Sequence, residues 1–92
     1  KPTAYFINTA RGDILDEDAL VRVLREKKIA GAALDVYQIE PLPARHRLLS
    51  LDNVILTPHI AAVSAQAVER AGHTVAQEVD RVLHGKKPRG TV

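Results

Sequence analysis

The chain has 92 residues, of which 46% are apolar and 26% charged, and its formal net charge is +2, a balance typical of a globular chain. It contains no cysteine and its four histidines lack the HExxH spacing, so we expect neither disulfides nor a metal site. Aromatic residues make up only 3%, and the basic residues are scattered apart from one short cluster near the end, so nucleic-acid binding is not expected either.

The first half of the chain is predicted to contain a strand, a helix and a second strand. Residues 5–8 (YFIN) are short, apolar and rich in strand-forming residues. Residues 16–28 have the spacing of an amphipathic helix, with Asp16 as N-cap and an acidic first turn. Residues 29–36 (IAGAALDV) form a nearly continuous apolar run, which indicates a strand buried on both faces.

The second half is predicted to add a loop, a third strand and a long helix. Residues 37–52 form a long connection, and loops of this length are often functional. Residues 53–57 (NVILT) indicate another buried strand, and residues 64–84 a helix with one apolar stripe. Gly72 costs about 1 kcal/mol relative to alanine inside a helix, so we expect a closely packed neighbour there.

Strands that alternate with helices predict an α/β fold with a parallel sheet and right-handed crossovers. The elements amount to about half of a doubly wound, Rossmann-like domain. We therefore expect residues 1–63 to be the second half of such a domain, and residues 64–92 to be a long helix and tail leading back to a domain outside the chain. Lys1 and Pro2 do not resemble a natural start, which also suggests that the protein begins elsewhere.

Each predicted strand is followed by residues that carry charge or titrate. Arg11 follows the first strand, Asp35 and Glu40 the second, and His59 the third. Because the carboxyl ends of parallel strands lie at one edge of a sheet, we expect these side chains to gather there. Each residue alone is better explained as a surface charge, a cap or a loop residue, and only their convergence at one edge indicates a site.

This set of side chains suits an anionic substrate that gains or loses a proton. Arginine grips a carboxylate with two charge-assisted hydrogen bonds, histidine transfers protons near neutral pH, and a carboxylate beside histidine favours the imidazolium form. The sequence has no GxGxxG or GxxxxGK motif, so hydride transfer would need a cofactor-binding motif outside this chain.

Three segments resemble the second half of the nucleotide-binding domain of D-isomer-specific 2-hydroxyacid dehydrogenases. They are INTARG at 7–12, GAALDVYQIEPLP at 31–43 and NVILTPHIA at 53–61, in the order and spacing of that family. The family includes phosphoglycerate, glyoxylate/hydroxypyruvate and D-lactate dehydrogenases. The resemblance covers nearly the whole chain and implies an NAD(P)-dependent oxidoreductase of small 2-hydroxy or 2-keto acids, using NAD or NADP.

The resemblance also implies roles for single residues. Arg11 corresponds to the arginine that binds the substrate carboxylate and carbonyl, Glu40 to the glutamate that hydrogen-bonds the catalytic histidine, and His59 to that histidine. These three are the implied catalytic residues. The positions implied to contact the cofactor are Thr9, Ala10, Arg11, Asp35, His59, Ile60, Ala61 and Ala62.

We further expect a cytoplasmic protein that forms a homodimer and binds a small 2-hydroxy or 2-keto acid as substrate. No nucleic-acid or membrane partner is expected. No apolar run approaches the length of a membrane span and no signal-peptide pattern opens the chain. Two alternatives stay open. One is a dinucleotide-responsive binding protein like the C-terminal-binding transcriptional corepressors, which keep the same site, and the other is an inactive truncation.

Overall fold

The computed structural model describes residues 1–90, which form two compact units. The first is Lys1–Ala61 and the second begins at Ala62. The tail expected over residues 64–92 includes residues 91 and 92, which lie outside the described part of the chain.

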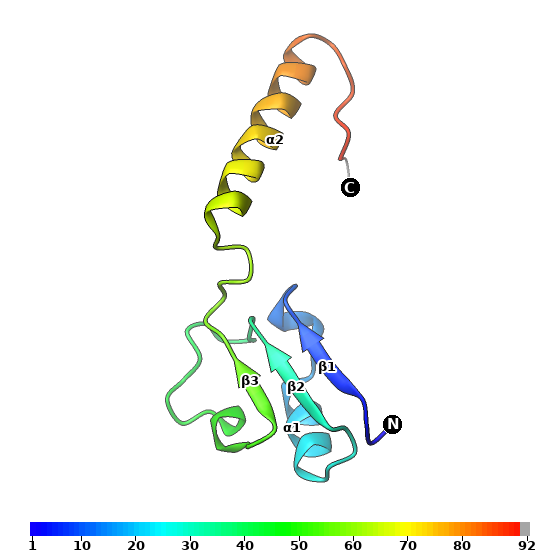
Figure 1. Cartoon of the computed structure of the whole chain (residues 1–92), viewed down its shortest axis with the longest axis vertical. Helices are drawn as coiled ribbons and strands as arrows, with labels where there is room; N and C mark the ends of the chain where they lie inside the picture. Colours follow the sequence, from blue (N-terminus) through cyan, green and yellow to red (C-terminus); the bar gives the residue numbers. More distant parts are fainter. Residues whose placement is uncertain (91–92) are drawn as a thin grey trace. The chain divides into compact units, whose positions relative to one another are not determined.

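The first unit alternates strands and helical segments in the predicted order (Figure 1). Two short 3₁₀ helices, η1 and η2, lie in the connections and were not predicted. The elements are β1 (Tyr5–Asn8), η1 (Gly12–Ile14), α1 (Glu17–Arg25), β2 (Gly31–Leu34), η2 (Arg47–Ser50) and β3 (Val54–Leu56).

The three strands form one parallel sheet in which β2 lies between β1 and β3. Asn8, the last residue of β1, is in register with Leu34, which is in register with Leu56 of β3. All three strands therefore end at the same edge of the sheet. This arrangement confirms the predicted α/β fold and aligns the loops that carry the candidate site.

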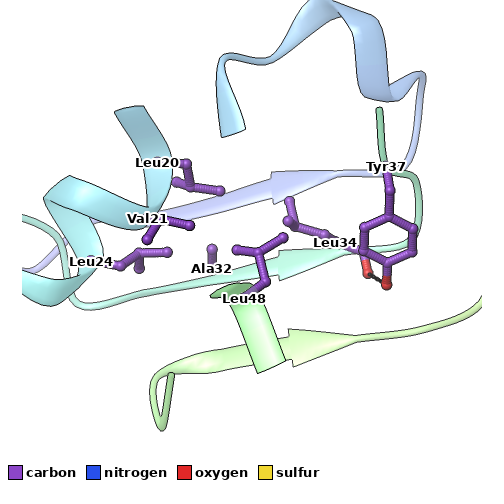
Figure 2. Close-up of a cluster of buried hydrophobic side chains, with 7 residues drawn as sticks. All are labelled: Leu20, Val21, Leu24, Ala32, Leu34, Tyr37 and Leu48. Atoms are coloured by element: carbon purple, nitrogen blue, oxygen red, sulfur yellow. Dashed lines mark hydrogen bonds between the residues drawn. The ribbon is translucent and has the colours of Figure 1, made fainter. Parts of the chain in front are cut away.

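One face of the sheet is covered by α1 and by η2. The side chains of Leu20, Val21 and Leu24 come from one face of α1, and together with Leu48 they pack on the β2 side chains of the same cluster (Figure 2). The opposite sheet face is open within the first unit, where Ile7 is 70% and Ile55 68% exposed. The expectation of strands buried on both faces is therefore wrong for β3, although β2 is largely buried.

Both α-helices begin at a capping side chain and end in a left-handed residue. Asp16 Oδ1 accepts a hydrogen bond from Ala19 N at 2.9 Å. At the other end, Lys27 N donates to Leu24 O and Lys28 N to Val23 O, with Lys27 at φ 52°. This is the Schellman pattern, which glycine usually completes. A lysine completes it here, so the sequence carried no stop signal and the predicted helix ran on to residue 28.

The second unit consists of α2 (Ala65–Leu83) and the segment after it. Ser64 caps the helix by accepting from Ala67 N at 3.1 Å, and Gly85 ends it at φ 70°, close to the predicted bounds. A Cβ placed on Gly72 would meet no atom within 4 Å, so within the described part of the second unit no close neighbour requires this glycine. The predicted apolar stripe is exposed, including Val68, Val75, Val79, Val82 and Leu83. Within residues 1–90, no helix is long and apolar enough to cross a membrane.

Candidate active site

The loop after β1 is shaped by the buried side chain of Asn8. Its Oδ1 accepts from Ala10 N at 3.0 Å, and its Nδ2 donates to Arg11 O at 2.9 Å. These bonds fix the backbone of the turn and leave Thr9, Ala10 and Arg11 exposed. The Arg11 guanidinium donates to Ala10 O at 2.7 Å, and within residues 1–90 it has no carboxylate partner. Its other donors therefore face no anion of the described chain.

Gly12 brings this loop into contact with the loop after β2. A Cβ at Gly12 would lie 2.0 Å from both the carbonyl carbon and the oxygen of Tyr37, and 2.5 Å from Gln38 N. Only glycine allows two backbones to approach so closely. The residue beside Arg11 is thus packed directly on the segment that leads to Glu40.

Glu40 and His59 form the central pair of the site. Glu40 Oε2 lies 2.7 Å from His59 Nδ1, and Glu40 Oε1 accepts from Tyr37 N at 3.0 Å. The hydrogen bond with His59, followed by that from Tyr37, holds the pKa of the Glu40 carboxyl below its usual value. Because Nδ1 faces Glu40, Nε2 is the ring nitrogen left to meet a ligand. His59 is exposed and has a φ of 54°, a conformation rare outside glycine and concentrated at functional sites.

Asp35 holds the loop that carries His59. Its side chain is buried, with Oδ1 accepting from Thr57 Oγ1 at 2.5 Å and from Ile60 N at 2.9 Å, and Oδ2 from Ala61 N at 2.8 Å. The bond from the Thr57 hydroxyl, followed by that from Ile60 N–H, lowers the pKa of the Asp35 carboxyl. The carboxylate therefore fixes the residues on both sides of His59.

Tyr37 joins the ends of β2 and β3 beneath this loop. Its hydroxyl lies 3.1 Å from Leu34 O and 2.8 Å from Thr57 O, and the ring belongs to the buried core (Figure 2). Burial raises the pKa of the Tyr37 hydroxyl. A pocket of about 590 Å³ opens beside the Glu40–His59 pair. Its lining residues are Tyr37, Glu40, Pro41, Leu42, Leu56, Thr57, Pro58 and His59.

The predicted residues divide into three groups in the structure. Glu40 and His59 are in direct contact, Asp35 supports their loop, and Arg11 reaches the same edge through Gly12 without a hydrogen bond to either. The predicted cofactor position at residue 62 belongs to the second unit. Sequence reasoning missed the supporting roles of Asn8, Tyr37 and Thr57, although all three stand in or beside the quoted motifs.

Exposed groups at this edge of the sheet could hold one end of a dinucleotide. Thr9, Ala10 and His59 offer exposed groups at the carboxyl edge, which is where ligands bind in parallel α/β sheets. The N–H groups of Ile60 and Ala61 are already engaged by Asp35, so these residues would contact a cofactor with their other atoms. The sequence contains no glycine-rich turn to hold the pyrophosphate.

The sequence profile of the family described as "D-isomer specific 2-hydroxyacid dehydrogenase, NAD binding domain" matches residues 1–61. The chain belongs to this family. Over 88 residues it is 51% identical to glyoxylate reductase from Thermofilum pendens, covering 96% of this chain and 26% of that protein. Over 86 residues it is 48% identical to D-3-phosphoglycerate dehydrogenase from Methanocaldococcus jannaschii, covering 94% of this chain and 16% of that protein.

Solved structures of 2-hydroxyacid dehydrogenases have the same fold. The D-isomer specific 2-hydroxyacid dehydrogenase from Xanthobacter autotrophicus Py2, crystallised with NADPH and MES, superimposes with a TM-score of 0.83 at 38% identity, over 99% of this chain and 37% of that one. These comparisons confirm the resemblance seen in the sequence. The chain thus spans roughly a quarter of glyoxylate reductase and about a third of the solved dehydrogenase.

Proposed function

We propose that the protein containing this chain is an NAD(P)-dependent oxidoreductase that interconverts small 2-hydroxy and 2-keto acids. The observation that carries this proposal is the Glu40–His59 pair, with a contact of 2.7 Å, at the carboxyl edge of a parallel sheet. The relatives, which include a glyoxylate reductase and a D-3-phosphoglycerate dehydrogenase, support the reaction class.

His59 is the acid/base group in this proposal. In the direction of reduction, its Nε2 donates a proton to the oxygen that develops at C2 of the substrate. Glu40 faces Nδ1 and stabilises the protonated ring before the transfer. When the substrate is oxidised, the same nitrogen accepts the proton. General acid–base catalysis of this kind contributes about 10²–10⁴-fold in rate.

Arg11 binds the substrate carboxylate and polarises the carbonyl. Its guanidinium has five N–H donors, and one of them is used by Ala10 O. The planar group can therefore still make two parallel bonds to a carboxylate. The bonds from Asn8 and the packing of Gly12 on Tyr37 fix the loop from which the side chain projects.

The proposed cofactor is NAD or NADP, which supplies or accepts the hydride when it is bound. The residues that would hold its nicotinamide end follow the three strands, and Asp35, after β2, also supports the loop after β3. They are the positions implied by the family resemblance, namely Thr9, Ala10, Arg11, Asp35, His59, Ile60, Ala61 and Ala62. The solved relative from Xanthobacter autotrophicus, which was crystallised with NADPH, supports this class of cofactor.

The proposal is tested with the complete protein that contains residues 1–92. Loss of reduced-nicotinamide absorbance is followed with NADH and with NADPH, each against glyoxylate, hydroxypyruvate and pyruvate. We expect turnover of at least one 2-keto acid. Dinucleotide binding without turnover of any of them would contradict the proposal and favour the corepressor-like alternative. The homodimer and the cytoplasmic location stay predictions, and sedimentation of the complete protein tests the first.

A further inference from the structure

A buried carboxylate outside the proposed site holds the loop that carries Glu40. Glu17, the first residue of α1, is only 5% exposed, which is rare for a glutamate without partners. Its Oε1 accepts from Gln38 N at 2.7 Å, and its Oε2 lies 3.3 Å from His46 Nε2. One side chain therefore contacts two points of the loop after β2, and Glu40 lies between them.

The backbone amide that bonds Glu17 is adjacent along the chain to the backbone amide that bonds Glu40. Tyr37 N–H donates to Glu40 Oε1 at 3.0 Å, and the next amide, that of Gln38, donates to Glu17. The side chain of Gln38 adds a bond from its Nε2 to Leu15 O at 2.7 Å. The backbone that orients Glu40 is thus itself oriented by the start of α1.

The contact at His46 fixes the far end of the loop. His46 Nδ1 accepts from Leu48 N at 3.3 Å, and Nε2, on the other side of the ring, faces Glu17 Oε2 at 3.3 Å. Leu48 is completely buried in the core. This end of the loop is therefore joined both to the hydrophobic core and to the Glu17 carboxylate.

We propose that Glu17 is a positioning residue for the Glu40–His59 pair, acting through the Tyr37–Gln38 backbone. Its effect on turnover rests on the function proposed above, while its effect on the orientation of Glu40 does not. A carboxylate at the start of a helix also stabilises that helix by its charge alone. The two roles depend on different properties of the side chain. Positioning depends on its length and on an acceptor oxygen, whereas helix stabilisation depends on its negative charge.

Two conservative substitutions separate these roles. Glu17→Asp keeps the charge but shortens the side chain by one methylene, so it no longer reaches Gln38 N. Glu17→Gln keeps the length and one oxygen acceptor but loses the charge. We expect Glu17→Asp to lower kcat by about tenfold and Glu17→Gln to stay within about threefold of wild type. The matched control is Asp18→Asn, which removes an exposed carboxylate from the same turn, one that pairs with Arg47 rather than with the site.

The second readout is a titration of the Glu40 carboxyl carbon by NMR in the same complete proteins. We expect Glu17→Asp to raise the pKa of Glu40 toward its ordinary value, and Glu17→Gln and Asp18→Asn to leave it as in wild type. A normal kcat for Glu17→Asp together with a reduced kcat for Glu17→Gln would overturn the proposal. A Glu40 pKa in Glu17→Asp equal to that of wild type would also overturn it. If the wild-type protein turned over no 2-keto acid, the proposed function would fail while this titration still decided the role of Glu17.

Discussion

Glu40 contacts His59 with one carboxylate oxygen and the backbone of Tyr37 with the other. The Glu40 carboxylate that contacts His59 is therefore oriented by the backbone of the chain itself. This geometry is typical of a histidine that is held in one ring orientation so that its second nitrogen can transfer a proton.

Replacing His59 with glutamine in the complete protein should lower kcat by about 10²-fold or more, because the amide cannot transfer a proton. The affinity for NADH should change little, since the amide is close to imidazole in size. Steady-state kinetics with a 2-keto acid and a separate NADH titration measure the two effects. His73→Gln, in exposed α2, is the matched control and should behave as wild type. A His59→Gln enzyme within about threefold of wild-type kcat would rule out the assignment.

Arg11→Lys should reduce kcat/KM for the 2-keto acid mainly through KM, by about 2–3 kcal/mol. Lysine keeps the charge but replaces a planar fork with a single ammonium, so the two parallel bonds to the carboxylate are lost. Arg70→Lys on α2 makes the same exchange at an exposed position and serves as the control. Equal kinetics for the two variants would show that Arg11 is only a surface charge.

The loop after β3 should loosen in acid. The Asp35 carboxyl has a lowered pKa, chiefly through the Thr57 hydroxyl. A carboxyl whose pKa is lower in the folded than in the unfolded chain stabilises the folded state. This stabilisation is complete above the pKa of the unfolded chain, about 3.9 for aspartate, and is lost as the pH falls through the pKa of the folded protein. We expect exchange protection of the Ile60 and Ala61 amides, corrected for intrinsic rates, to decrease below about pH 4.

Asp35→Asn should remove most of this pH dependence and lower the protection of the same two amides at neutral pH, because an amide offers a single acceptor oxygen. Asp52→Asn changes an exposed aspartate in the turn before β3 and is the control. Protection that stayed constant from neutral pH to acid in the wild-type protein would show that the Asp35 carboxylate does not hold this loop.

Gly12→Ala and Gly72→Ala should have opposite effects on stability. The first places a Cβ 2.0 Å from backbone atoms of Tyr37, which cannot move without displacing the loop, so we expect a loss of at least about 1–3 kcal/mol and reduced kcat. The second meets no atom within 4 Å and should stabilise α2 by about 1 kcal/mol. Thermal unfolding of the two variants measures the difference, and a Gly12→Ala protein as stable as wild type would contradict the close backbone contact.

The strand and helix pattern of this chain was predictable because it depends on local signals. Apolar runs, a capping aspartate and a glycine after the last helix were enough for the order of elements and for a parallel sheet with a shared edge. Two local signals misled. Lys27 occupies a left-handed position that glycine usually marks, and the apolar run of β3 indicated burial on both faces although helices cover only one face of the sheet within the first unit.

The candidate site was predictable in its charged residues but not in its supports. Arg11, Glu40 and His59 follow directly from strand ends and family motifs. Glu17 reads in sequence as an ordinary acidic residue of a first helical turn, and its bond to Gln38 joins positions 21 residues apart. Contacts of this kind depend on how α1 packs beside the loop, which no local pattern specifies.

Residues 1–92 alone should neither bind NADH tightly nor reduce a 2-keto acid. The pyrophosphate of a dinucleotide is normally held by a glycine-rich turn and a helix N-terminus, and this sequence has no such turn. Arg11 and His59 would contact only the nicotinamide end. The open face of the sheet and the exposed apolar stripe of α2 should also make this piece self-associate. Calorimetric titration of NADH into purified residues 1–92, with the complete protein measured alongside, tests both points. A stable monomer that bound NADH with about micromolar affinity would contradict them.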